Sequence, residues 1–389
     1  MVHSIAALGR YMPPLLASLM LLVTAACGDT AVGPTVEEAE TDTATSPTAD
    51  EDATNAEQPQ TVEEVLAAVD GLELDERRVE LMRMAEAEEG PVLVYTSMTL
   101  MAENLDVIRP SLKEATGLDM EIYRASGEDI RARILQESGA GRHEVDVIET
   151  AARELEVLAG EGLIAPYDGP YVEALIEGSA HENWDATRLN VYTVAWNTNA
   201  VSQDERPQSY EGLGDERWAG RLTLEPSDYD WFWSVSNYWS EEKGMSEQEV
   251  DALWQQIADN ATFTQGHTST TELLGVGEYD VMASAFAPTV ERFKQEGQPV
   301  EWRPPVEPLF TTPNAASAYQ NTTQPASAVL FMDWLFSDAQ EIFEEKEIFV
   351  TREDLRDPVL EGLDVRIIDV EQFLENEQAV MEEYEALAR

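Results

Sequence analysis

Apolar positions along the chain follow two alternating patterns from residue 61 onward. Between residues 61 and 90 they recur at helical spacing, which predicts one or two amphipathic helices. Three short apolar runs come next, each followed by a polar loop and a helical pattern: Val92–Tyr95, Met120–Tyr123 and Val145–Ile148. Strand, loop and helix repeated in this order are typical of parallel βαβ units, whose ligands lie beside the loops at the carboxyl ends of the strands. The pattern therefore predicts an α/β fold.

Hydroxyl and acidic residues fill the three loops that follow these strands. They are Thr96 and Ser97, Ser126 and Glu128, and Glu149 and Thr150. Residues of this kind often cap helices, because their side-chain oxygens accept hydrogen bonds from N–H groups at helix N-termini. The same N–H groups bind ligands in many proteins. Each residue is therefore a candidate both for a helix cap and for a ligand contact.

The N-terminal part of the chain carries a different pattern. Leu15–Ala26 is an apolar run of twelve residues, too short to span a bilayer and typical of a secretory signal peptide. The single cysteine, Cys27, follows directly, and the sequence before it resembles the lipobox of bacterial lipoproteins, although Thr24 replaces the usual aliphatic residue. The next residues hold almost no large apolar side chain, which predicts a disordered tether. We interpret residues 1–26 as a signal peptide and residues 27–60 as a lipidated cysteine with an acidic tether.

The charge of the chain limits its partners. Asp and Glu number 77 against 24 Lys and Arg, which gives a formal charge of -53. Nucleic-acid binding is excluded, because neutralising phosphates requires a surplus of cations. Only four of the basic residues are lysines, and so acidic a surface favours a protein adapted to salt, since salt screens its self-repulsion. A secreted protein that is merely acidic is the alternative.

An ordered set of segments resembles the extracellular solute-binding proteins grouped with the ferric-iron and thiamine binding proteins of ABC importers. The resemblance covers about residues 65 to 345. Its segments are Leu112–Gly117 (LKEATG), Arg131–Gly141 (RARILQESGAG), Gly160–Tyr167 (GEGLIAPY), Trp218–Leu224 (WAGRLTL), Asp228–Phe232 (DYDWF), Leu273–Tyr279 (LLGVGEY) and Ala326–Gln340 (ASAVLFMDWLFSDAQ). The resemblance implies a type II periplasmic-binding-protein fold, in which crossing strands join two α/β lobes and a ligand lies between them. The expected crossings are Val191–Asn197 and a return near Trp302–Pro313.

The resemblance also implies a domain organisation and a role. We expect lobe 1 over residues 61–192 and 304–345, lobe 2 over residues 193–303, and a C-terminal helical segment, residues 346–389, packed on lobe 2. The expected role is that of the substrate-binding lipoprotein of an ABC importer. Such a protein is anchored by lipid outside the cytoplasm, acts as a monomer without a cofactor, and hands a small solute to a permease and its ATPase subunits.

The residues at the expected iron site differ from those of ferric members of the family. Those members bind iron through two adjacent tyrosines, helped by a histidine and a glutamate. Here Ala287 and Pro288 stand in place of the tyrosines, Thr99 in place of the histidine, and Ala151 in place of the glutamate. The implied ligand is therefore a small polar or cationic organic solute. Ferric iron held by another set of oxygen donors is the alternative.

Lobe 2 supplies further candidates at the starts of its helices. Asp228 and Asp230 begin one helix, where they can cap it and complement its dipole, or face a cationic ligand beside the ring of Trp231. His267 opens the next helix as a structural residue or as a donor to the ligand. The complete expected ligand-binding set is Thr96, Ser97, Ser126, Glu128, Thr150, Asp228, Tyr229, Trp231, His267 and Ser284.

The motifs do not favour an enzyme. The segment His181–Asp185 (HENWD) begins like a zinc-protease helix but ends in Asp where a second His belongs. Gly275 and Gly277 lack the third glycine of a dinucleotide-binding loop, and no Gly-x-Ser-x-Gly motif occurs. We therefore expect no catalysis. A secreted two-lobed enzyme is the disfavoured alternative, and a receptor that presents its ligand to a membrane sensor stays open.

Overall fold

The computed structural model describes residues 59–389. The expected signal peptide, Cys27 and almost all of the tether lie outside these residues. Within the described part of the chain, no helix combines the length and apolar character needed to cross a membrane.

One half of the sheet, in lobe 1, is built from the predicted βαβ units. Its strands β1 (Val92–Thr96), β2 (Met120–Arg124) and β3 (Val147–Ala151) pair in parallel in the order β2-β1-β3. Strands β1 and β2 lie where the apolar runs predicted them, whereas β3 begins two residues later than predicted and includes Glu149 and Thr150. Their carboxyl ends therefore meet at one edge, which brings the three polar loops together.

Lobe 2 holds the other half of the sheet. Strands β6 (Leu222–Leu224), β7 (Ala261–Phe263) and β8 (Val281–Phe286) are parallel, with β6 between β7 and β8. The short strands β4 (Ile164–Ala165), β9 (Val300–Glu301) and β11 (Val365–Ile367) pair at the side with β10, β5 and β10, respectively.

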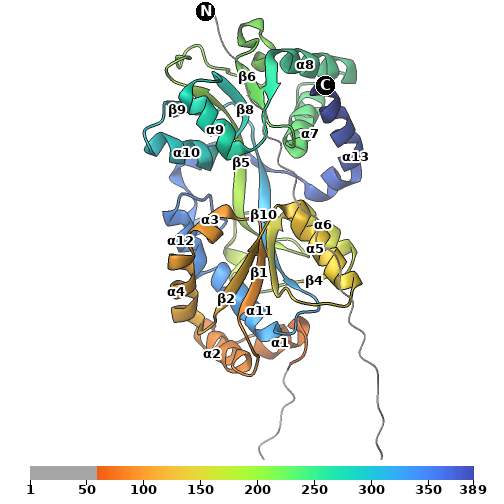
Figure 1. Cartoon of the computed structure of the whole chain (residues 1–389), viewed down its shortest axis with the longest axis vertical. Coiled ribbons are helices and arrows are strands. Elements are labelled where there is room, and N and C mark those ends of the chain that lie inside the picture. Colours follow the sequence, from red (N-terminus) through yellow and green to blue (C-terminus); the bar gives the residue numbers. More distant parts are fainter. Residues whose placement is uncertain (1–58) are drawn as a thin grey trace, which may run out of the picture. The chain divides into compact units, whose positions relative to one another are not determined.

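Two long antiparallel strands join the lobes into an α/β fold. Strand β5 (Asp185–Asn197) pairs with strand β10 (Leu309–Tyr319) at its start and with β8 and β9 at its end. Figure 1 shows both strands running from one half of the folded part into the other. The predicted crossing at Val191–Asn197 is the end of β5. The return strand begins later than Trp302, because three prolines delay regular pairing until Leu309.

Thirteen helices cover the described sheet. They are α1 (Val62–Val69), α2 (Leu74–Ala85), α3 (Thr99–Glu103), α4 (Leu105–Thr116), α5 (Gly127–Gly139), α6 (Ala152–Gly160), α7 (Tyr229–Asn237), α8 (Glu247–Asn260), α9 (His267–Val276), α10 (Ala287–Gln295), α11 (Pro325–Leu335), α12 (Asp338–Glu345) and α13 (Val370–Leu387). The segment Ala326–Gln340 forms two helices rather than one. The helix is interrupted at Ser337, whose hydroxyl donates a hydrogen bond to the carbonyl of Asp333.

Each lobe has its own apolar core. In lobe 1, every residue of α11 is buried, and this helix packs with α1, α2 and α4 against the sheet. In lobe 2, the core is rich in tryptophan and includes Trp218, Trp231, Trp239 and Trp254. The last helix, α13, packs on α7 of lobe 2 and also touches α6 of lobe 1.

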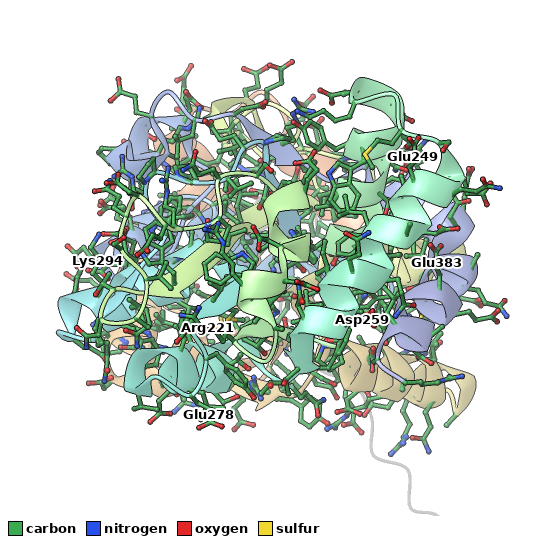
Figure 2. The ribbon with its side chains drawn as sticks, turned by 90° about the horizontal axis from the view of Figure 1, so that it is seen from above. Arg221, Glu249, Asp259, Glu278, Lys294 and Glu383 are labelled. Carbon is green, nitrogen blue, oxygen red and sulfur yellow. The ribbon has the colours of Figure 1, made fainter. Side chains whose placement is uncertain are left out.

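Charged side chains of lobe 2 lie on its surface. Figure 2 labels Glu249, Asp259, Glu278 and Glu383, all of which are exposed and come from different parts of lobe 2 and α13. Although its side chain reaches the solvent, neighbouring atoms partly shield the carboxyl of Glu383 from water and raise its pKa, and the acids Asp251 and Glu247 raise it further. Like charges therefore lie close enough on this surface to repel each other.

Candidate functional site

A cavity of about 370 Å³ lies between the two lobes. This volume falls within the range of about 300–1,000 Å³ that small-molecule sites occupy in proteins. Figure 1 shows α3, α10 and α12 around the same side of the crossing strands. The lining residues are Ser97, Met98, Thr99, Leu100 and Glu103 of lobe 1, Arg188, Asn190 and Asn314 of the crossing strands, Thr268, Phe286, Pro288, Thr289 and Arg292 of lobe 2, and Lys346, Glu347 and Ile348 after α12.

Residues of the two crossing strands form the floor of the cavity. Arg188 and Asn190 are two residues apart on β5, so their side chains share one face. On β10, Asn314 pairs with Arg188. Polar side chains from both strands therefore lie together beneath the cavity, although the strands around them are almost wholly buried.

Two helices of lobe 2 begin at the cavity wall. Helix α9 starts at His267 and helix α10 at Ala287, and neither N-terminus has a side-chain cap. Thr268 and Thr289, in their first turns, line the cavity. Backbone N–H groups of a first turn lack partners within the helix, which makes these two helix starts suitable for binding polar ligand atoms.

Arg188 has an unused donor in the cavity wall. The residue is 8% exposed. Its Nη1 donates to Oδ1 of Asn190 at 3.3 Å, and its Nη2 lies 3.3 Å from Oε1 of Glu149. Among the described residues, its Nε has no hydrogen-bond partner. A buried guanidinium with a free N–H is suited to donate to a ligand.

The lobe 1 residues expected from the sequence divide into structural and cavity residues. Thr96 is fully buried and donates to Oε2 of Glu149 at 2.5 Å. Ser126 caps α5, since its Oγ accepts from the N–H of Asp129, which is the cap interpretation. Of the lobe 1 set, Ser97 lines the cavity.

Glu128 and Thr150 lie away from the cavity lining. Glu128 has an exposed side chain whose Oε1 is 3.9 Å from Nη2 of Arg153. Thr150 is completely buried, and its Oγ1 has no hydrogen-bond partner in residues 59–389. Thr150 lies within strand β3 and Glu128 in the first turn of α5, and neither residue lines the cavity.

Asp228 pairs with His267 instead of capping α7. It occupies the N-cap position without a side-chain hydrogen bond to the helix, and its Oδ1 lies 3.0 Å from Nε2 of His267. Burial raises the pKa of Asp228 to about 6, while His267 and the hydroxyl of Ser284 act in the opposite direction. Burial lowers the pKa of His267, but the carboxylate of Asp228 outweighs this effect and the net shift is upward.

This pair supports an aromatic wall of the cavity. The ring of His267 stacks on Phe286 with centroids 3.6 Å apart. Phe286 lines the cavity and also lies 5.1 Å from the ring of Tyr192. His267 and Asp228 therefore hold Phe286 in place from behind.

Trp231 and Tyr229 do not form the expected stacking surface. Trp231 is fully buried and packs edge-on against Trp254, because the first turn of α7 directs it into the lobe 2 core. Tyr229 is partly buried beside Tyr384 of α13. The aromatic residue at the cavity is Phe286, which the sequence reasoning missed.

The other acid of this turn is fully occupied. Asp230 accepts hydrogen bonds from the hydroxyls of Tyr192 and Thr312, both on crossing strands. Its Oδ1 also accepts from the N–H of Trp231 at 3.0 Å. Asp230 therefore fixes α7 to the crossing strands and has no free face for a cationic ligand.

One group of side chains has the donor atoms of a metal site. Glu225, Asp228 and His267 each offer a ligand atom, and these atoms lie within 4.8 Å of one another. Carboxylate oxygens and an imidazole suit several transition metals. Part of this donor set is already engaged, since Glu225 accepts from the N–H groups of Ser227 and Gly266 and Asp228 contacts His267. Oδ2 of Asp228 and Nδ1 of His267 have no hydrogen-bond partner among the described residues.

Comparison with known proteins identifies the family. Residues 110–342 match the family of bacterial extracellular solute-binding proteins. The chain belongs to this family. Members of this family are extracellular solute-binding proteins. No protein with a curated function matches the sequence.

Solved structures show the same two-lobed fold for this solute-binding protein. The periplasmic binding protein P5PA superposes with a TM-score of 0.63 at 17% identity, over 77% of this chain and 100% of P5PA. Iron-bound HitA from Pseudomonas aeruginosa gives 0.62 at 17% identity, over 75% of this chain and 99% of HitA. AfuA from Actinobacillus pleuropneumoniae, bound to fructose-6-phosphate, gives 0.63 at 17% identity, over 76% of this chain and 98% of AfuA. At these identities the likeness concerns the fold.

Proposed function

We propose that this chain captures a small polar organic solute in the cavity between its lobes and delivers it to the permease and ATPase subunits of an ABC importer. The observation that carries the proposal is the cavity itself, which combines polar side chains from both lobes with a floor from the crossing strands. A site shared by two lobes couples binding to hinge bending, because a ligand that contacts both lobes favours their closure. No chemical step on the solute is proposed.

Among the residues expected from the sequence, we propose Ser97 as a direct ligand contact. Asp228, His267 and Ser284 are proposed to act behind it by holding Phe286. We also propose the lobe division at residues 61–192, 193–303 and 304–345, with residues 346–389 as a C-terminal segment. It is supported by β5 and β10, which pass between the lobes near two of these boundaries.

A melting-shift screen tests the proposed function. A ligand that binds only the folded chain stabilises it by about 2.7 kcal/mol at a hundredfold excess over Kd, so binding raises the melting temperature. The screen covers sugars, amino acids, amines, organic acids and phosphates. Phe286→Ala is expected to weaken the shift, while Phe263→Ala, which removes a partly buried ring of lobe 2 outside the cavity, is the matched control. Equal loss in both variants contradicts the assignment of the site.

Ferric iron is the second candidate ligand, and the cluster of Glu225, Asp228 and His267 is the observation in its favour. Binding there requires the ion to displace the contact between Asp228 and His267. The same melting assay with ferric citrate, and citrate alone as control, separates the two candidates. An iron-dependent shift that disappears in Asp228→Asn contradicts the organic-solute proposal.

We further propose that Cys27 carries lipid and holds the protein on the outer face of the cell membrane. The apolar run before it and the small residues Ala25 and Ala26 support this proposal. Two acyl chains make a stable anchor, so Cys27→Ala is expected to release the protein into the medium. Mass spectrometry of the wild type provides the second readout. A variant that stays with the membrane, together with an unlipidated wild type, contradicts the anchor.

A further inference from the structure

The cavity gathers positive charge in a chain that has little of it. Arg188, Arg292 and Lys346 line the cavity, although the whole chain has only 24 basic residues against 77 acids. Arg292 and Lys346 form no ion pair with any carboxylate in the described part of the chain. Two acids, Glu103 and Glu347, also line the cavity, and neither pairs with these cations. In so acidic a protein, cations left without a partner beside a cavity are available to a ligand.

Arg188 provides the independent observation that the site is built for a ligand. More than nine-tenths of the residue is buried, and its Nε lacks a hydrogen-bond partner within residues 59–389. Leaving a buried donor unsatisfied is unfavourable by about 1–3 kcal/mol. This Nε has almost no accessible surface, so an acceptor in the cavity reaches its N–H only when the guanidinium turns toward the ligand, and that contact then removes the penalty.

The N-termini of two helices at the cavity also favour negative charge in a ligand. Helices α9 and α10 have ten and nine residues, and both begin at the cavity without a side-chain cap. A helix N-terminus carries partial positive charge and favours an anion. Arg292 lies on the second turn of α10, so one helix supplies both a guanidinium and free N–H groups.

The acids expected to receive a cationic ligand are already paired. Asp228 contacts His267, and Asp230 accepts from Tyr192 and Thr312. Neither acid lines the cavity. The surroundings of the cavity therefore favour a ligand of negative rather than positive charge.

We infer that the solute carries an anionic group, a carboxylate or a phosphate, which binds to Arg188, Arg292 and the N-terminus of α10. This inference rests on the proposed function and names the charge class of its ligand. Phe286 and Ser97 then contact the uncharged part of the solute. Lys346, at the C-terminal end of α12, adds a third positive charge to the cavity lining.

Matched probes test the charge class directly. Melting shifts and calorimetric titrations at fixed ionic strength compare fructose 6-phosphate with fructose, citrate with glycerol, and putrescine as a cation. We expect an anionic probe to bind and the neutral partner and putrescine to bind at least tenfold more weakly. Phosphate and carboxylate sources are distinguished by which of fructose 6-phosphate and citrate binds.

Variants locate the effect. Arg292→Gln removes an exposed cation and is expected to weaken anion binding about 10- to 100-fold, the effect of losing one charge-assisted hydrogen bond. Arg188→Gln is expected to act similarly, and its melting point without ligand shows whether it folds. Arg303→Gln is the matched control. Arg303 is exposed and lies outside the cavity lining, and its substitution removes the same charge.

The outcomes separate the inference from the proposed function. Binding by fructose or putrescine alone overturns the anionic ligand but leaves the solute-binding role intact. Equal anion binding in Arg292→Gln and Arg303→Gln overturns the site. If no probe binds, the inference also fails, and solute uptake by cells that carry the chain with its permease decides the proposed function separately.

Discussion

Two buried arginines of this protein have different surroundings. Arg77, on α2, donates to both carboxylate oxygens of Asp333 on α11, at 2.7 and 3.1 Å, and Tyr167 donates to the same carboxylate at 2.6 Å. Arg188, in the cavity floor, has two longer contacts of 3.3 Å, with Glu149 and Asn190, and leaves its Nε without a partner among the described residues. The chain thus holds the Arg77 guanidinium with two hydrogen bonds to one carboxylate, whereas Arg188 keeps a buried donor free, which suits its proposed role in ligand binding.

The largest expected effect comes from breaking the Arg77 pair. Asp333→Ala leaves a guanidinium buried without a partner, which costs about 3–5 kcal/mol of unfolding free energy. Urea denaturation measures this change. Arg78→Gln is the control, because the pair of Arg78 with Asp338 is half exposed and such pairs contribute about 0–1 kcal/mol. If Asp333→Ala lowers the free energy of unfolding no more than Arg78→Gln does, the pairing of the buried Arg77 does not matter for stability, and the comparison fails.

Salt is expected to act on the surface and not on the buried pair. The Debye length falls from about 10 Å at 0.1 M to about 3 Å at 1 M salt, so repulsion among exposed acids weakens. The melting temperature is therefore expected to rise between these concentrations. The cost of Asp333→Ala is expected to stay constant, because water and ions do not reach that pair. A melting temperature that does not change with salt speaks against a salt-adapted surface.

The smallest expected effect concerns His267 and Asp228, which are buried at the edge of the cavity. The pKa of His267 is raised in the folded state. Its contribution to stability is therefore complete below the unfolded pKa of about 6.5 and is lost as pH rises through the folded value. The raised pKa of Asp228, about 6, adds a loss of stability as pH rises from about 4 to 6. The contribution of His267 is measured by comparing the melting temperatures of wild type and His267→Gln as pH rises above 6.5. The same pH dependence in both proteins contradicts a contribution from His267.

The sequence predicted most of the fold, because periodicity reports local structure. The three apolar runs became β1, β2 and β3, and the helical spacing before them became α1 and α2. The sequence analysis missed the break at Ser337, although Ser337 and Asp338 interrupt the apolar pattern and a serine often begins a helix. At this break the chain turns from α11 into α12. Tertiary packing of both helices against α4 determines this turn.

The cavity was harder to predict than the fold. Sequence reasoning placed candidates at the ends of strands and found Ser97, but it missed Arg188, Asn190 and Asn314 on the crossing strands. Alternation of polar side chains along β5 was the available signal, and it was obscured because the predicted crossing began only at Val191. Lys346 comes from a distant segment, and only the folded chain brings it to the cavity.

The course of the chain determines which lobe directly follows the proposed tether. Helix α1 lies in the lobe 1 core through Val62 and Val65, so the segment that leads from Cys27 attaches to lobe 1. After α12, the chain passes between the lobes a third time and ends with α13 against lobe 2. Under the proposed anchor at Cys27, the membrane is therefore linked along the chain to lobe 1 first, and lobe 2 is reached only through the crossing strands.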